Sequence, residues 1–200
     1  MTFDLKLFNK WSTEGIEVND ISLKPYINLK PVLVPRTGGR AGANRLWAEQ
    51  APIVERLMNK MMVSGHKGKK HKIGSGYNTG KASKLYKVVE KTLTIIEHQT
   101  KKNPIEVLVR AIENACPREE ITTIEYGGAR YPQAVDMAPL RRIDIALRQM
   151  VQGSYQKSFN SKAHIEKVLA DEIMAAYNND QKSAAISKKL EIERQSDASR

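Results

Sequence analysis

The chain has 200 residues, with 33 Lys or Arg against 22 Asp or Glu, a formal net charge of +11 and a pI near 9.7. This length allows one domain with extensions, and a hydrophobic fraction of 40% is enough for a core. The single cysteine excludes an intramolecular disulfide, and no apolar run reaches the ~20 residues that span a bilayer. The first residues also lack the apolar run of a signal peptide, so we expect a cytoplasmic protein without membrane association.

The first 50 residues are predicted to form an extended arm, because Pro25, Pro31 and Pro35 interrupt any helix. We expect this arm to lie along a surface, with partial order. Helical periodicity dominates after it, so residues 51–200 are predicted to be a helical domain.

Two predicted helices flank a loop rich in glycine and lysine. An apolar stripe predicts the first helix over residues 53–63, with Pro52 at a favourable starting position. The loop covers residues 64–79, and the second helix follows over residues 80–98.

Residues 103–116 give the clearest helical signal in the chain. Asn103 is a good N-cap, Pro104 fits the first turn, and Pro117 ends the helix. The periodicity then changes, because residues 119–137 alternate in the manner of strands around a central Gly-Gly pair. We therefore predict a β-hairpin, with few large apolar residues, that projects from the domain.

Helical periodicity returns and predicts three more helices, over residues 139–152, 161–177 and 184–196. Gly153 is expected to stop the first of these, while Ser161 and Ser183 are expected to cap the other two. The predicted fold class is mainly α, with about six helices, one projecting β-hairpin between the third and fourth helices, and the extended N-terminal arm.

The excess positive charge is concentrated in one quarter of the chain. Residues 36–89 contain twelve Lys or Arg and only two acids, whereas residues 1–35 are neutral and residues 90–200 have a net charge of +1. No carboxylate lies between Glu55 and Glu90. A basic surface that served solubility alone would be spread more evenly, so this distribution predicts a polyanionic partner.

The basic loop is interpreted as a nucleic-acid-binding segment, because phosphates relieve the repulsion between its lysines and release counterions. The alternative is a flexible, solvated linker. Cations on the neighbouring helices favour binding, because they extend the charge onto ordered structure. Tyr77 could stack on a base, but we expect it to pack against the protein. The predicted RNA-binding residues of this region are Arg56, Lys60, Lys67, Lys69, Lys70, His71, Lys72, Lys81 and Lys84.

Metal binding and catalysis find no support in the sequence. The four histidines and the one cysteine do not form a spacing typical of a metal site, so no metal or cofactor is predicted. Asp171 and Glu172 are interpreted as the solvated acidic face of a helix, paired with Lys167. No motif joins a carboxylate to a nucleophile, so the protein is not expected to be an enzyme.

Arg141 and Arg142 lie in the first turn of a predicted helix, where positive charge opposes the helix dipole. They are interpreted as a phosphate clamp that uses the free N–H groups of that turn, the alternative being tolerance at an exposed position. Lys188 and Lys189 place two further charges on the last helix. They could bind phosphate or could simply be tolerated at exposed positions.

Several long segments, in order along nearly the whole chain, resemble the small-subunit ribosomal protein seven family in its archaeal and eukaryotic branch. They are LFNKWST (7–13), NDISLKPYI (19–27), APIVERLMNKMM (51–62), NPIEVLVRAIENACPRE (103–119), RYPQAVDMAPLRRIDIAL (130–147), LADEI (169–173) and AISKKLEIER (185–194).

The resemblance implies a six-helix fold with a hairpin between the third and fourth helices. It also implies a structural constituent of the small ribosomal subunit that binds the 3′ major domain of its RNA and nucleates assembly of the head. Neighbouring head proteins are implied partners, and messenger and transfer RNA lie near the hairpin at the exit site. The matched RNA-contacting positions are Arg36, Arg40, Arg45, Lys67, Lys69, Lys70, Lys72, Arg130, Arg141, Arg142, Lys188 and Lys189.

Two departures from the family pattern are visible. Ala138 replaces the usual serine before PLRR, so Asp136 is expected to cap that helix instead. The hairpin carries only Arg130 near its tip, where relatives have more arginines. The competing interpretations of the whole chain are a DNA-binding or chromosomal protein and a protein–protein adaptor.

Overall fold

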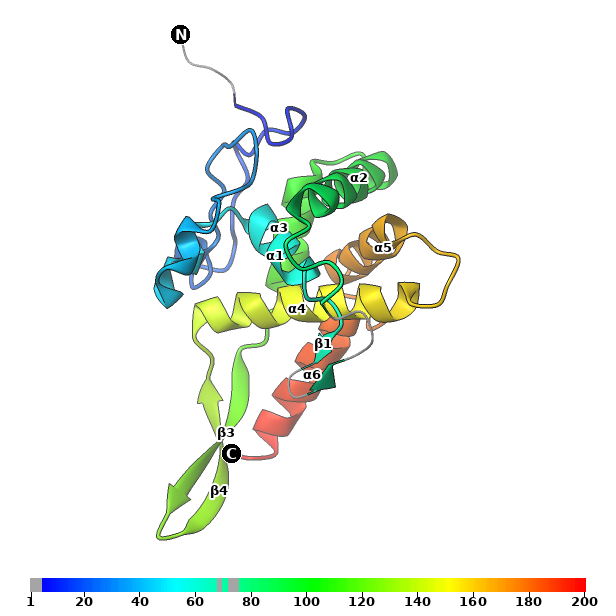
Figure 1. The fold of residues 1–200 in the computed structure, drawn as a ribbon. Coiled ribbons are helices and arrows are strands. Elements are labelled where there is room, and N and C mark those ends of the chain that lie inside the picture. The colour runs from blue at the N-terminus through cyan, green and yellow to red at the C-terminus, as the bar shows by residue number, and fades with distance from the viewer. Residues whose placement is uncertain (1–4, 68–69, 72–75) are drawn as a thin grey trace.

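The computed structural model describes residues 5–67, 70–71 and 76–200 and shows a mainly helical molecule (Figure 1). Its helices are α1 (Ile53–Met61), α2 (Ala82–Thr100), α3 (Pro104–Ala115), α4 (Pro139–Ser158), α5 (Ile165–Tyr177) and α6 (Ala184–Asp197). Strands β3 (Glu119–Tyr126) and β4 (Ala129–Asp136) form an antiparallel hairpin between α3 and α4. The predicted fold class is therefore confirmed. No helix of the described residues is long and apolar enough to cross a membrane.

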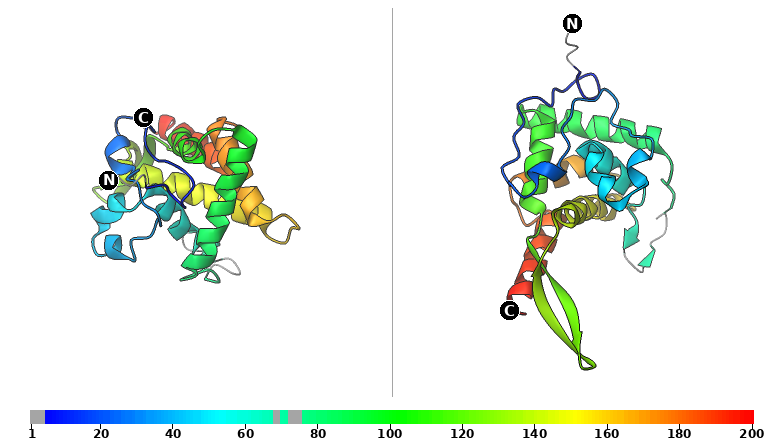
Figure 2. Two further views of the ribbon diagram at one scale, coloured as in Figure 1. Left: turned by 90° about the horizontal axis from the view of Figure 1, so that it is seen from above. Right: turned by 90° about the vertical axis from the view of Figure 1, so that its left-hand side faces the viewer.

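The apolar core lies between the helices, where α4 packs on α1, α3, α5 and α6, and α2 packs on α1, α3 and α5 (Figures 1 and 2). Its largest fully buried side chains come from α1 to α5, with Leu23 as the one contribution from the first 50 residues. Other side chains of that arm also reach the core, because Phe8, Trp11 and Ile27 are buried against it. The described part of the arm is thus packed onto the helices, with short 3₁₀ turns η1 (Lys24–Tyr26), η2 (Arg40–Gly42) and η3 (Arg45–Gln50).

Two of the expected helix caps are confirmed. The Asn103 side chain accepts a hydrogen bond from the Ile105 N–H at 3.0 Å, which satisfies a free donor at the start of α3. Ser183 caps α6 in the same way. The expected Asp136 cap is wrong, because α4 begins after Ala138 without any side-chain cap. The expected Ser161 cap is also wrong, because α5 begins at Ile165.

Gly153 does not end the fourth helix, as the sequence suggested, but lies within α4. A Cβ atom at this position would lie 2.5 Å from Cβ of Ala184, closer than real Cβ contacts occur. The glycine therefore allows α4 to approach the start of α6 closely. Its backbone conformation is ordinary helix, so packing explains its presence.

The hairpin projects from the helical body (Figure 1), as expected. Its register runs from Glu119↔Asp136 at the base to Tyr126↔Ala129 at the tip, where Gly127 and Gly128 adopt positive φ. The C-terminal helix braces the base, because the Arg118 N–H donates to Glu193 and the Arg200 side chain pairs with Glu119.

A candidate nucleic-acid interface

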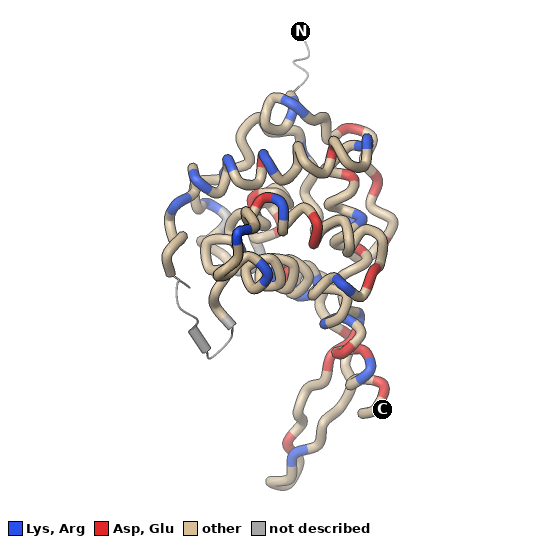
Figure 3. Tube along the Cα trace, turned by 90° about the vertical axis from the view of Figure 1, so that its right-hand side faces the viewer, with Lys and Arg blue, Asp and Glu red and all other residues tan. Residues whose placement is uncertain are grey.

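Five cations of the arm and the start of α2 form no ion pair with any acid that the structure describes. Arg36 and Arg40 lie in the arm, and Lys81, Lys84 and Lys87 lie at the start of α2. All five are exposed, and the structure gives none of them an ion pair with any described residue. Figure 3 shows basic positions following one another along α2. We call these five residues the open cation face.

The two predicted cations of α1 have a different environment. Arg56 is only 5% exposed, and its guanidinium donates to Asp144 at 3.0 Å and to the Tyr26 carbonyl at 3.2 Å. Lys60 reaches the same carboxylate at 3.2 Å. Burial raises the pKa of Asp144, but Lys60 and Arg56 lower it more, so its net pKa lies below the ordinary value. Arg56 thus joins the arm, α1 and α4 inside the protein.

The basic loop forms a small ribbon whose strands are β1 (His66–Lys67) and β2 (Lys70–His71). It is attached to the helical body, because the Gln152 side chain of α4 donates to the His66 carbonyl at 2.5 Å. For Lys67, Lys70, His71 and Arg45 the structure describes the backbone, and Arg45 begins η3. Lys69 and Lys72 lie outside the described residues.

Tyr77, which we expected to pack against the protein, is 67% exposed, and that expectation is wrong. The Nζ atom of Lys81 lies 3.8 Å from its ring centroid and that of Lys84 lies 5.7 Å away. Cation–π attraction to two lysines holds the aromatic ring at the surface. The ring therefore adjoins the open cation face.

Arg141 and Arg142 occupy opposite environments, although they are neighbours. The Arg142 guanidinium is buried and donates to the Pro117 carbonyl, Ser22 and Asp20. Arg141 is exposed and forms an ion pair with Glu120 of the hairpin at 2.7 Å. Arg142 therefore fastens the arm to α4, and the structure does not bring the two arginines together as one clamp.

The remaining predicted cations also have partners within the chain. Arg130 lies 3.5 Å from Glu125 across the hairpin, and Lys188 lies 2.9 Å from Glu191 on α6. Lys189 donates to the Asn114 carbonyl at the end of α3. The Glu125 pair is highly exposed and the Glu191 pair is partly exposed, so a phosphate can compete for their cations.

Glu172 was expected on a solvated face with Asp171, but it is only 1% exposed, so that interpretation is wrong. Its carboxylate accepts hydrogen bonds from Lys157, Ser183 and the Ala184 N–H, at 2.6, 2.8 and 2.6 Å. It is thus a second cap for α6, supplied by α5. Ser183 indicated the start of α6 in the sequence, but no local pattern indicated that Glu172 also caps this helix.

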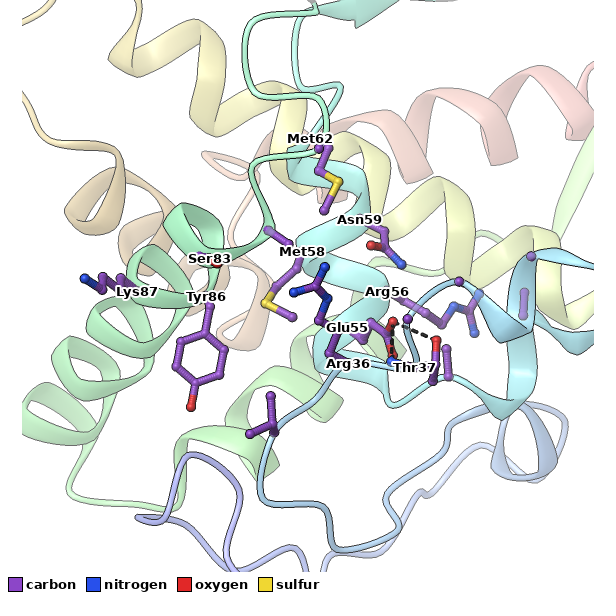
Figure 4. A pocket seen from close by; sticks show the side chains of 18 residues that line it. Arg36, Thr37, Glu55, Arg56, Met58, Asn59, Met62, Ser83, Tyr86 and Lys87 are labelled. Atoms are coloured by element: carbon purple, nitrogen blue, oxygen red, sulfur yellow. Dashed lines mark hydrogen bonds between the residues drawn. The ribbon is translucent and has the colours of Figure 1, made fainter.

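An open groove lies between the arm, α1 and the start of α2 (Figure 4), with a volume of about 610 Å³. Among the described residues that line it, Glu55 is the only one with a carboxylate. That group is buried and accepts three hydrogen bonds from the backbone and hydroxyl of Thr37. Within the described parts of the chain, no cluster of three or more His, Cys, Asp or Glu could hold a metal ion.

Comparison with known proteins agrees with the architecture. Residues 23–200 match the family described as ribosomal protein S7p/S5e. The chain is also 53% identical over 196 residues to a protein named small ribosomal subunit protein uS7 from Nanoarchaeum equitans, covering 98% of this chain and 99% of that protein. The extent of both matches shows that the chain belongs to the ribosomal protein S7p/S5e family.

Proposed function

We propose that the protein is a structural constituent of the small ribosomal subunit and binds the 3′ major domain of its RNA. The observation that carries this proposal is the open cation face of Arg36, Arg40, Lys81, Lys84 and Lys87. Neighbouring cations repel one another, and no described carboxylate offsets the charge of these five. RNA phosphates supply the missing counter-charge, and the release of condensed counterions drives binding.

The helical body holds the cationic segments at fixed relative positions. Arg56 and Arg142 bond the arm to α1 and α4. Arg36 and Arg40 therefore belong to a segment that is attached to the core before RNA binds. A preorganised surface loses less entropy on binding than a free tail. Such a surface recognises RNA mainly by shape, since the A-form major groove is too deep and narrow for side chains.

We also propose RNA contacts at Arg45, Lys67, Lys69, Lys70, His71 and Lys72, on their basic character in the sequence. Five further cations are proposed contacts that must exchange a partner within the protein for a phosphate: Lys60, Arg130, Arg141, Lys188 and Lys189. For Arg56 and Arg142, burial favours an architectural role. We further propose that the hairpin lies near the exit site, beside messenger and transfer RNA, and that head proteins are its neighbours in a cytoplasmic ribosome.

A competition experiment tests the proposal. The full chain is bound to a labelled transcript of the small-subunit 3′ major domain and challenged with unlabelled transcript or with duplex DNA. We expect the transcript to compete far better than DNA, and the logarithm of affinity to fall by about 0.7–0.9 per neutralised phosphate for each log unit of salt. Equal competition favours a DNA-binding protein, and a slope near zero favours a protein adaptor; either result refutes the proposal.

A further inference from the structure

The groove of Figure 4 has three walls, and phosphate binding by the open cation face does not account for its shape. One wall is the arm from Val34 to Gly42, the opposite wall is α1, and the start of α2 closes the third side. Its volume of about 610 Å³ is within the ~300–1,000 Å³ typical of small-molecule sites. The groove is therefore large enough for one nucleotide.

The lining combines an apolar floor with a few polar groups. Met58, Met62 and Ala82 contribute the apolar surface, and thioethers make favourable contacts with flat aromatic rings. Asn59 and Ser83 add an amide and a hydroxyl, both exposed and both without a hydrogen bond to any described residue. Such groups can bond to the edge of a base that lies on the floor.

Charge identifies the kind of ligand that fits. Arg36 extends from the arm toward the α1 wall, and Lys87 extends outward at the rim (Figure 4). Glu55, the one carboxylate among the described lining residues, is bonded to Thr37 and forms no ion pair with Arg36 or Lys87. An occupant with a flat, largely apolar part and an adjacent anionic group complements this arrangement.

We propose that the groove receives one unstacked nucleotide of the bound RNA, with its base on the methionines and its phosphate beside Arg36. This inference rests on the proposed function. The protein would recognise a single base in addition to the shape of the folded RNA. An acidic peptide also carries negative charge, but the continuity of the groove with the open cation face favours RNA. Proteins commonly recognise RNA through splayed bases of this kind.

Filling the groove tests the proposal. Gly42 lines it, and a Cβ atom added there meets no atom within 4 Å, so Gly42→Leu fits the protein but occupies the groove. Exposed Ser83 offers a second filling variant, Ser83→Trp, from α2. With the transcript of the 3′ major domain, we expect either folded variant to bind roughly tenfold more weakly, near the lower end of the loss for one stacked base. One base that the wild type protects from chemical modification should become reactive.

Single charge removals provide the matched comparison. Arg36→Gln should lower the salt slope by about 0.7–0.9, the contribution of one phosphate. Lys91→Gln removes the same charge from an exposed position on α2 that does not line the groove, and it should leave the slope unchanged. If both changes reduce the slope equally, the groove has no special phosphate contact and the proposal fails.

The outcomes separate this inference from the proposed function. If the wild type binds the transcript but both filled variants bind equally well with the same protected bases, the groove proposal is overturned and RNA binding stands. If the wild type does not bind, the proposed function itself is wrong. A photocrosslinker at position 83 in assembled subunits identifies the occupant: a crosslink to RNA supports a nucleotide, and one to protein alone overturns it.

Discussion

The arginines inside the molecule and the cations on its open face follow from similar sequence signals but have opposite surroundings. Arg56 and Arg142 are buried, and their carboxylate partners Asp144 and Asp20 lie 88 and 122 positions away in the chain. Lys81 and Lys84 are exposed and lack any such partner among the described residues. The tertiary partner, rather than local charge density, thus decides whether a cation stabilises the fold or remains available for a ligand.

Replacing Arg142 should give the largest effect on stability. Arg142→Met leaves the Pro117 carbonyl and Asp20 without their buried donor, so we expect a loss on the order of 3 kcal/mol in the free energy of unfolding. Urea denaturation measures this loss. The control is its exposed neighbour in Arg141→Gln, which should cost no more than about 1 kcal/mol. Equal losses would break the distinction between internal and surface arginines.

Removing lysines from the open cation face should weaken RNA binding and leave the fold intact. In Lys81→Gln/Lys84→Gln/Lys87→Gln, we expect unchanged helical content by circular dichroism, because these side chains are exposed and form no ion pair with any described residue. The salt slope of RNA binding should fall by about two to three units. The same number of substitutions at Lys162, Lys167 and Lys182, which lie elsewhere on the surface, should change the slope less. A large loss of helix in the first variant would show that these lysines are structural.

Gly153 tests the difference between interior and surface positions without a change of charge. Gly153→Ala places a methyl group against Ala184, and relief of the clash between α4 and α6 should cost about 1–3 kcal/mol. Gly42→Ala, where the added atom meets nothing within 4 Å, is the control and should be close to neutral. Thermal unfolding measures both. A neutral Gly153→Ala would mean that the two helices separate easily.

The smallest effect is expected at the hairpin. Arg130 is highly exposed and lies at salt-bridge distance from Glu125, so Arg130→Gln should change stability by less than about 0.5 kcal/mol. It should reduce the salt slope by at most the ~0.9 of one phosphate. A loss of binding as large as that of the triple lysine variant would place the main RNA contact on the hairpin instead.

The sequence predicted the helices and the hairpin because each follows from local periodicity, caps and turn residues. It failed at Gly153, where the reason for glycine is the approach of Ala184 from a helix that begins 26 positions after α4 ends. It failed at Glu172 because an acid that caps another helix has the same local pattern as a solvated one. Both errors concern contacts between distant segments.

The candidate site was predicted with similar limits. Local charge identified the region, and Lys81 and Lys84 are indeed exposed and unpaired among the described residues. The same reasoning also selected Arg56 and Arg142, because nothing near them in the chain reveals their burial. Tyr77 was assigned to packing because two lysines that hold it at the surface cannot be recognised before the helix places them beside its ring.

The central claim is that RNA supplies the counter-charges of the open cation face. Amine-reactive labelling of Lys81, Lys84 and Lys87, read by mass spectrometry in the free protein and in intact small subunits, tests it most directly. The account predicts strong protection of these three amines in the subunit, with exposed Lys162 or Lys167 serving as an internal reference. Equal labelling of the three in both states would contradict the account.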